Sequence, residues 1–256
     1  MIEFLNVSKT FISSDGSLVE ALRGVSLSVF PGEFVSLVGA SGCGKSTLLR
    51  LINGLIPPTS GELRLDGQRV LSPRPDCAMV FQAATLLPWA NIENNVLFPL
   101  TLQRRLTRED RDFAAQLLTK AGLDSFEKKM PRELSGGMQQ RVAICRGLVQ
   151  KPRVLLMDEP FGALDALTRE QMSLELLKLW EEFKIAVLFV THSIPEAVLL
   201  SDRVVVMSPR PGRVVDVVDI DLERPRQFSQ TTTPEFQSIT NRIRTLILGE
   251  KAAYAD

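Results

Sequence analysis

The sequence has little of the chemistry that marks several large protein classes. Its three cysteines, Cys43, Cys77 and Cys145, are odd in number and have no CxxC spacing, which argues against a disulfide framework or a zinc site. Thirty basic and thirty acidic residues cancel, so no overall field draws the chain to nucleic acid or anionic lipid. No apolar run is long enough to span a bilayer, and the first residues lack the pattern of a signal peptide. We therefore expect a reduced, soluble, cytoplasmic protein.

Patterns of apolar residues predict an α/β chain interrupted by a helical segment. Residues 2–30 alternate like antiparallel strands around Asp15-Gly16, and Asp66-Gly67 predicts a tight hairpin within residues 63–70. Residues 83–150 are rich in helix formers, after which short apolar runs at 154–157, 186–191 and 203–207 are typical of buried parallel strands. We assign residues 1–82 and 151–229 to a core, 83–150 to a helical subdomain, and 230–256 to a tail with one helix.

A glycine-rich segment between an apolar strand and a helix predicts phosphate binding. Residues 39–47 read GASGCGKST and match the pattern G-x-x-x-x-G-K-[ST] in the structural context that this motif requires. The glycines let backbone N–H groups surround phosphates, and the following helix contributes its dipole. Lys45 would reach the β and γ phosphates, and the Ser46 hydroxyl would bind Mg²⁺. Cys43 lies inside this phosphate loop, where a cysteine is usually a small filler, although alkylation of a thiol there would be inhibitory.

Two carboxylates follow the buried strand at residues 154–157. Asp158 and Glu159 would lie at the carboxyl edge of a parallel sheet, where α/β proteins bind ligands. Asp158 would hold Mg²⁺ directly or through water, and Glu159 would orient or deprotonate the attacking water. An acidic pair at a strand end can also be merely solvated; the preceding phosphate loop favours catalysis.

The segment LSGGMQQR, residues 134–141, forms a second turn suited to an anion. A serine and two glycines precede a helix-forming run, although the chain already has a complete phosphate loop. This redundancy indicates that Ser135, Gly136 and Gly137 serve a nucleotide held by another subunit.

The phosphate loop, LSGGMQQR and the strand ending in Glu159 together resemble the nucleotide-binding subunit of ABC transporters, over about residues 1–210. The resemblance implies a P-loop NTPase (RecA-like) α/β core with an N-terminal antiparallel β subdomain and a helical insertion. It implies ATP and Mg²⁺ as cofactors, and ATPase activity coupled to transmembrane transport. Met138, where the family most often has glutamine, and Ser193, where it often has aspartate, depart from the pattern; Ser193–Glu196 still predicts a capping box at a helix start.

The resemblance assigns further roles. Phe11 would stack on adenine, although a single aromatic can equally be a core residue. Gln82 would touch Mg²⁺ or the attacking water and act as a hinge for the helical subdomain. Asp165 would belong to the D-loop at the dimer interface and also cap a helix. His192, the one histidine, would bond to the γ-phosphate, whereas a lone histidine is usually structural or exposed. ATP contacts are thus assigned to Phe11, Gly39, Ser41, Gly42, Cys43, Gly44, Lys45, Ser46 and Thr47, with Ser135, Gly136 and Gly137 acting in trans.

Two segments narrow the expected subgroup. Residues 86–92, LLPWANI, and 208–213, SPRPGR, resemble importers of nitrate, sulfonates and taurine. Pro88 and Trp89 could be core residues or a docking patch for a membrane subunit. The implied partners are a second ATPase subunit, forming a homodimer, permease subunits and, indirectly, an extracytoplasmic solute-binding protein. The implied location is peripheral, at the cytoplasmic face of the inner or plasma membrane.

Two other functions fit parts of the pattern. A soluble ABC-type ATPase in DNA repair, translation or cofactor assembly usually has tandem cassettes, coiled-coil insertions or basic surfaces, and none is visible here. A P-loop kinase for small molecules leaves LSGGMQQR and Pro88-Trp89 without a role. We expect no nucleic-acid partner.

Overall fold

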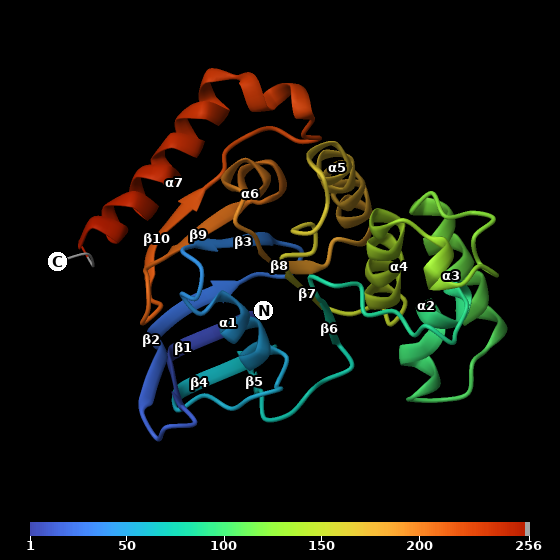
Figure 1. Cartoon of the computed structure of the whole chain (residues 1–256), viewed down its shortest axis with the longest axis horizontal. Helices are drawn as coiled ribbons and strands as arrows, with labels where there is room; N and C mark the ends of the chain where they lie inside the picture. Colours follow the sequence, from blue (N-terminus) through green and yellow to red (C-terminus); the bar gives the residue numbers. More distant parts are fainter. Residues whose placement is uncertain (254–256) are drawn as a thin grey trace. The chain divides into compact units, whose positions relative to one another are not determined.

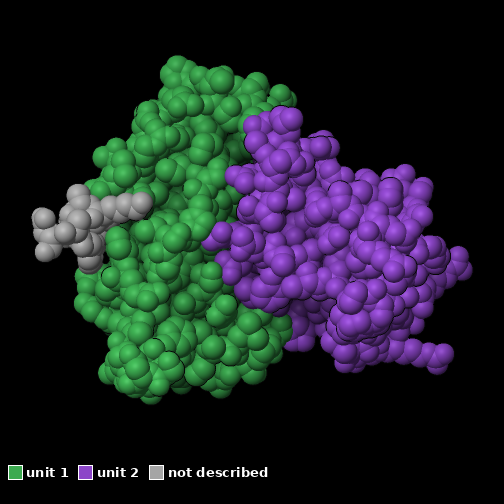
Figure 2. Space-filling model, viewed as in Figure 1, with its two compact units in different colours: residues 1–74, 186–256 green, residues 75–185 purple. Residues whose placement is uncertain are grey.

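The computed structural model describes residues 1–253, with side chains as far as residue 249. The chain forms two compact units, residues 1–74 with 186–256 and residues 75–185, coloured green and purple in Figure 2. The chain therefore leaves the first unit after Arg74 and returns to it at Ala186. Among the described residues, no helix combines the length and apolar character needed to cross a membrane.

The first unit combines two sheets with three α-helices (Figure 1). Its elements, in chain order, are β1 (Ile2–Ile12), β2 (Leu18–Val29), β3 (Phe34–Gly39), α1 (Lys45–Ile52), β4 (Ser60–Leu65), β5 (Gln68–Arg69), β8 (Ala186–Val190), α6 (Ile194–Leu200), β9 (Arg203–Met207), β10 (Val214–Asp219), the short 3₁₀ helix η2 (Phe228–Thr232) and α7 (Pro234–Ala253).

One sheet is antiparallel, with strand order β2-β1-β4-β5, as the alternation in residues 2–30 predicts. The predicted hairpin is confirmed: Asp66 and Gly67 adopt φ values of 52° and 74° between β4 and β5, as a primed two-residue turn requires. This sheet is held together by buried apolar residues on its inner face, including Phe4 and Leu63.

The other sheet of this unit has the order β10-β9-β3-β8. The strands β8 and β9 lie parallel to β3 on either side of it, and every residue of β3 and β8 is buried, which confirms the predicted parallel core. The edge strand β10 pairs antiparallel with β9 and was missed, because it follows a proline- and glycine-rich segment and contains Asp216 and Asp219 among its valines.

Helices cover both faces of this sheet (Figure 1). The helix α1 packs against β3 and β8 and also against β4 of the antiparallel sheet, and its buried face includes Leu48 and Leu49. On the other face, α6 packs on β3 and β9, and α7 packs on α6, β9 and β10. The predicted C-terminal helix is thus present, with Phe236 and Ile243 buried.

The second unit is mostly helical around one pair of parallel strands. Its elements are β6 (Cys77–Val80), α2 (Ile92–Thr101), α3 (Arg108–Lys120), the 3₁₀ turn η1 (Pro131–Glu133), α4 (Gly136–Leu148), β7 (Val154–Asp158) and α5 (Ala166–Phe183). Residues 83–150, all described, contain no strand, as predicted. The helices α2 and α3 pack on α4, which in turn packs on β6.

Candidate nucleotide-binding site

The phosphate loop connects β3 to α1 in the first unit. Gly42 and Gly44 adopt φ values of 74° and 105°, which side-chain-bearing residues rarely adopt. A Cβ on Gly44 would also lie 2.6 Å from Leu22 Cδ2 and 2.9 Å from the Ala21 carbonyl. Glycine at this position is therefore required both by the backbone conformation and by the close approach of β2.

The Lys45 side chain folds back along the loop that precedes it. It is 4% exposed, and its Nζ donates to the carbonyls of Gly39 at 3.0 Å and Ala40 at 3.1 Å. The Cys43 Sγ is 3.7 Å away. These partners are neutral, so they hold the ammonium group in place without cancelling its charge. That arrangement leaves the charge available to a phosphate.

His192 follows β8, the parallel neighbour of β3. Since the carboxyl ends of parallel strands share a sheet edge, the exposed His192 lies at the same edge as the phosphate loop. Ser193 caps α6 by accepting from the Glu196 N–H at 3.4 Å. The reciprocal bond of the predicted capping box, from the Ser193 N–H to the Glu196 carboxylate, is wrong. The Glu196 carboxylate bonds instead to the Thr191 hydroxyl, and that hydroxyl accepts from the Ser193 N–H at 3.0 Å.

Phe11 lies near the end of β1 and is 36% exposed. It is therefore not a core phenylalanine. Lys9 Nζ lies 5.2 Å from the centroid of its ring and is held there by a 2.7 Å bond to the Pro57 carbonyl. With a cation at one face, the ring can offer its other face to a planar ligand.

In the second unit, β7 carries the acidic pair. Parallel pairing matches Val80 of β6 to Met157 of β7, so Gln82 and Glu159 follow equivalent positions. A Cβ on Gly162 would lie 3.1 Å from Gln82 Nε2 and 3.7 Å from Glu159 Cβ, so both side chains lie around this glycine. Glu159 has a φ of 48°, a left-handed conformation that costs about 1–3 kcal/mol and is concentrated at functional sites.

The LSGGMQQR segment, residues 134–141, forms the start of α4. We call this segment the signature turn. Ser135 is exposed and caps α4, accepting from the Met138 N–H at 3.3 Å. Gly136 is exposed as well, whereas Gly137 is buried, and a Cβ on Gly137 would lie 2.9 Å from Thr168 Cγ2. The same Thr168 donates to Asp165, its hydroxyl at 2.6 Å and its N–H at 3.0 Å.

Asp165 therefore caps α5, as predicted, and these bonds from Thr168 hold the pKa of its carboxyl below the ordinary value. Gly137 at the start of α4 and Thr168 in the first turn of α5 consequently lie against each other.

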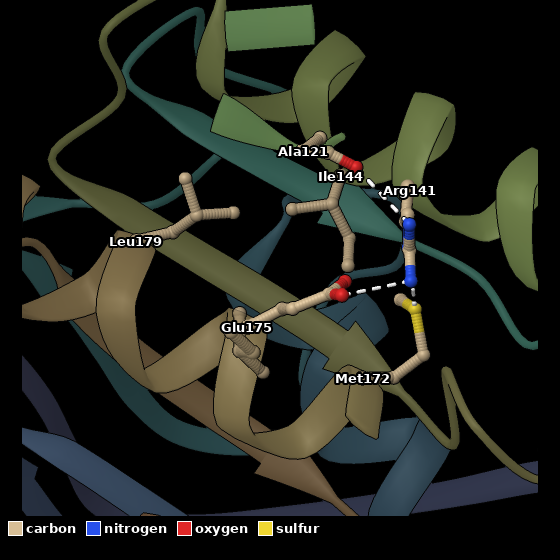
Figure 3. A pocket seen from close by; sticks show the side chains of 7 residues that line it. Ala121, Arg141, Ile144, Met172, Glu175 and Leu179 are labelled. Carbon is tan, nitrogen blue, oxygen red and sulfur yellow. Dashed lines mark hydrogen bonds and ion pairs between the residues drawn. The ribbon is translucent and has the colours of Figure 1, made fainter. Parts of the chain in front are cut away.

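A second contact joins α4 to α5 deeper in the unit (Figure 3). The Arg141 guanidinium donates to Glu175 at 2.7 Å, to the Ala121 carbonyl at 3.3 Å and to Met172 Sδ at 3.3 Å. A cavity of about 10 Å³, the size of one water, lies beside this group. Burial raises the pKa of the Glu175 carboxyl although Arg141 opposes the shift. Arg141, the last residue of LSGGMQQR, thereby joins α4 to α5.

The segment after Gln82 is held by buried and half-buried polar side chains. Asn95 is fully buried, and its side chain accepts from the Leu87 N–H at 2.7 Å and donates to the Ala90 carbonyl at 2.9 Å. Arg146 donates to the Ala84 carbonyl at 2.7 Å. Trp89, within this loop, is 76% exposed, so the core alternative for Trp89 is excluded and an aromatic group faces solvent.

A glycine-rich loop between a parallel strand and a helix, with its lysine held over it, defines a P-loop nucleotide-binding protein. The model of one family, described as "ABC transporter", matches residues 22–162. The chain belongs to this family.

Relatives match over nearly the whole chain. The chain is 48% identical to an uncharacterized ABC transporter ATP-binding protein of Methanocaldococcus jannaschii over 96% of its own length and 90% of that protein. It is 45% identical to the nitrate import ATP-binding protein NrtD of Synechocystis over 98% and 96%, and 44% identical to the taurine import ATP-binding protein TauB of Rhizobium johnstonii over 96% of each.

A solved dimeric structure of the ABC transporter cassette MJ0796 has a TM-score of 0.76 at 36% identity, covering 87% of this chain and all of that one. A post-hydrolysis dimer of the same cassette was solved with ADP and phosphate and has a TM-score of 0.75. The α/β P-loop fold predicted from the sequence is confirmed.

Sequence reasoning missed several residues that hold these segments in place. Lys9, Asn95 and Thr168 carry no motif, and their partners lie 5 to 48 residues away or on another helix. The Ser208–Arg213 segment was noted from the sequence, but only for its resemblance to importers of nitrate, sulfonates and taurine.

Proposed function

We propose that the chain powers the import of a small anionic or zwitterionic solute. Relatives of similar length are named for nitrate and taurine import, and a longer relative is named for bicarbonate transport. These solutes share small size and charge. Solute selection belongs to other subunits of such importers, so the proposal names a class of solute.

ATP would bind with its phosphates on the loop at residues 39–47. Backbone N–H groups and the amino end of α1 favour negative charge there, and Lys45 adds a full positive charge. Adenine would stack on Phe11, whose ring is half-exposed.

The residues assigned to Mg²⁺ suit that ion. Ser46, Gln82 and Asp158 supply hydroxyl, amide and carboxylate oxygens, which are the ligands that this hard cation prefers. Among the described residues, no group of three or more histidine, cysteine, aspartate or glutamate side chains could hold a metal. Mg²⁺ needs only one or two carboxylates beside the nucleotide phosphates, and when bound it would offset phosphate charge.

Hydrolysis would depend on Glu159 and His192. Glu159 would orient and deprotonate the attacking water, with Gln82 beside it. The His192 ring would donate a hydrogen bond to the γ-phosphate, stabilising the charge that develops there.

A second copy of the chain would complete the site in trans. Ser135 and Gly136 are exposed at the start of a helix, and Leu167 beside Asp165 is 78% exposed. An exposed anion-binding turn beside an exposed apolar residue fits a surface that is covered in a dimer. ATP held by Lys45 of one copy would meet the signature turn of the other.

The observation that carries the transport role is Trp89, an exposed indole on a loop held by the buried Asn95. We assign this loop to docking on a permease subunit. Residues 83–150 would move as a helical subdomain against a core of residues 1–82 and 151–229, with 230–256 as the tail. The chain would then work as a peripheral subunit at the cytoplasmic face of the membrane, with a solute-binding protein on the opposite side.

Replacing Glu159 tests the ATPase assignment. We expect Glu159→Gln to bind ATP with nearly unchanged affinity and to lose at least about 100-fold in turnover, because the group that accepts the proton of water is removed. Phosphate release and nucleotide titration measure the two effects. Near-normal turnover would remove Glu159 from its assigned role.

Replacing Trp89 separates a transporter subunit from a soluble ATPase. We expect Trp89→Ser to retain ATP binding and to lose co-purification with membrane subunits from its native host. Leu102→Ser is the matched control, because Leu102 is 72% exposed at the other end of α2. Co-purification of the unmodified chain with nucleic acid, and without membrane subunits, would favour the alternative. Uptake of nitrate, taurine and bicarbonate by the intact complex would identify the solute.

A further inference from the structure

The segment Ser208–Arg213, which we call the strap, connects β9 to β10 in the first unit. Neither the ATP contacts nor the docking loop uses it. Its backbone lies against the phosphate loop, although more than 160 residues separate the two in the sequence.

Three contacts join the strap and the end of β9 to the phosphate loop. Arg210 Nε donates to the Gly42 carbonyl at 3.3 Å. Gly212 lies so close to the loop that a Cβ on it would be 1.9 Å from the Cys43 carbonyl oxygen. At the end of β9, the Met207 carbonyl lies 2.8 Å from the position of a Cβ on Gly39.

The strap is itself firmly held. Ser208 is 2% exposed, and its Oγ lies 2.9 Å and 3.0 Å from the carbonyls of Pro209 and Pro211 and accepts from the Arg213 N–H at 3.0 Å. The Gly212 N–H donates to the Ala21 carbonyl of β2 at 2.9 Å. The contacts to the phosphate loop therefore come from a rigid segment.

These contacts fix the direction of two successive peptide groups. In a trans peptide the carbonyl and the N–H point in opposite directions. With the Gly42 carbonyl turned toward Arg210, the Cys43 N–H must point away from the strap, and it donates across the loop to the Ala40 carbonyl at 3.3 Å. With the Cys43 carbonyl against Gly212, the Gly44 N–H must also point away from the strap. The Gly44 N–H is thereby directed away from the strap, as an anion-binding nest of backbone N–H groups requires, whereas the Cys43 N–H stabilises the loop itself through the Ala40 carbonyl.

We propose that the strap positions the phosphate loop for the nucleotide, and that Arg210 and Gly212 are positioning residues for phosphate binding. This inference rests on the proposed binding of ATP at the loop. Loss of the strap contacts lets the two peptides turn, which weakens binding of any nucleotide with phosphates on the loop. Turnover at saturating ATP changes little, because neither residue touches the water or its base.

The experiment compares Arg210→Met with Arg213→Met in the full chain. Both arginines are exposed and lie in the same strap, but the contact at Arg213 is made by its backbone. We expect Arg210→Met to raise the Kd of ATP and of ADP about 3- to 10-fold, as loss of one exposed hydrogen bond implies, and Arg213→Met to leave both within twofold. Arg210→Lys retains a cation and is expected to recover part of the affinity.

The split between KM and kcat separates positioning from general destabilisation. We expect the KM for ATP to rise while kcat stays within about twofold, whereas a partly unfolded sample has a lower kcat at unchanged KM. Gly212→Ala is expected to have a larger effect on Kd, with Gly249→Ala as its control, because a Cβ on Gly249 meets open space. If Gly212→Ala does not fold, Arg210→Met alone decides.

Unchanged affinity in Arg210→Met, or an equal loss in Arg213→Met, would overturn the role of the strap. If the unmodified chain bound no ATP, the proposed function would fail and the inference with it. ATP binding by the unmodified chain therefore has to be measured first.

Discussion

Gly137 lies against Thr168, so the signature turn at the start of α4 contacts the first turn of α5. Thr168 is held by Asp165 through both its hydroxyl and its N–H, so it cannot turn away from an added carbon without losing the cap of α5. Gly42 is constrained by its φ of 74°, and Gly44 both by its φ of 105° and by the close approach of β2. At the scale of single residues, the site depends on glycine positions that cannot accept a side chain.

Replacing Gly137 tests that constraint. We expect Gly137→Ala to lower the free energy of unfolding by about 1–3 kcal/mol, because the new Cβ would lie 2.9 Å from Thr168 Cγ2 and overpacking has that cost. Gly136→Ala is the control for stability, since the nearest atom to its Cβ is 4.0 Å away. Urea unfolding of both variants measures the difference, and equal stabilities would show that Thr168 can move.

At the scale of elements, the short helix α6 shows how a segment of seven residues is stabilised. Its carboxyl end faces Arg226, which is 5% exposed and donates to the carbonyls of Val198 at 3.0 Å and Ser201 at 2.5 Å. Arg226 also donates to the Ile220 carbonyl at 3.0 Å. A cation at the carboxyl end of a helix favours the helix dipole. The helix that follows His192 is thereby fixed at its far end.

Removing the Arg226 guanidinium is expected to be strongly destabilising. Arg226→Met would leave several buried carbonyls without a donor, and we expect a loss of about 3 kcal/mol or more in the free energy of unfolding. Arg244→Met is the control, because Arg244 is exposed on α7. Burial lowers the pKa of Arg226 to about 10. The group is therefore charged in both native and unfolded chains between pH 6 and 9, and the loss should be constant over that range. A marked change of the loss with pH would contradict this account.

At the scale of the whole molecule, we propose that the chain functions only as a dimer. The dimeric structures of the related cassette MJ0796 support dimerisation, and the exposed signature turn supplies a surface for it. Because ATP lies between the copies in this arrangement, the γ-phosphate would favour the closed dimer and hydrolysis would release it.

A bulky cation at the signature turn tests pairing. We expect Ser135→Arg, in the Glu159→Gln background, to abolish the ATP-dependent dimer that Glu159→Gln alone forms, because the side chain would occupy the space of the trans nucleotide. ATP binding by the monomer should stay within about twofold, since Ser135 is not part of the loop that holds ATP in cis. Light scattering and nucleotide titration measure both. Loss of ATP binding to the monomer would contradict the trans assignment.

The sequence by itself determined the features that depend on local pattern. The phosphate loop, the two acidic residues at the end of β7 and the start of α4 follow from spacing, because glycine conformation, strand period and helix capping act over a few residues. Alternation of apolar residues likewise predicted the antiparallel strands, and short apolar runs predicted the parallel ones. The strand β10 was not predicted, because its aspartates and the preceding prolines conceal it.

Only the tertiary structure decided which distant groups hold these segments. Asn95 fixes the loop that carries Trp89, Thr191 takes the carboxylate expected to complete the cap at Ser193, and the strap turns the peptides of the phosphate loop. Hydrogen bonds and close packing of this kind depend on where the residues lie in space. They cannot be read from the separation of the residues along the sequence. The motif names the atoms that would contact phosphate, whereas the packing around it sets the direction in which they point.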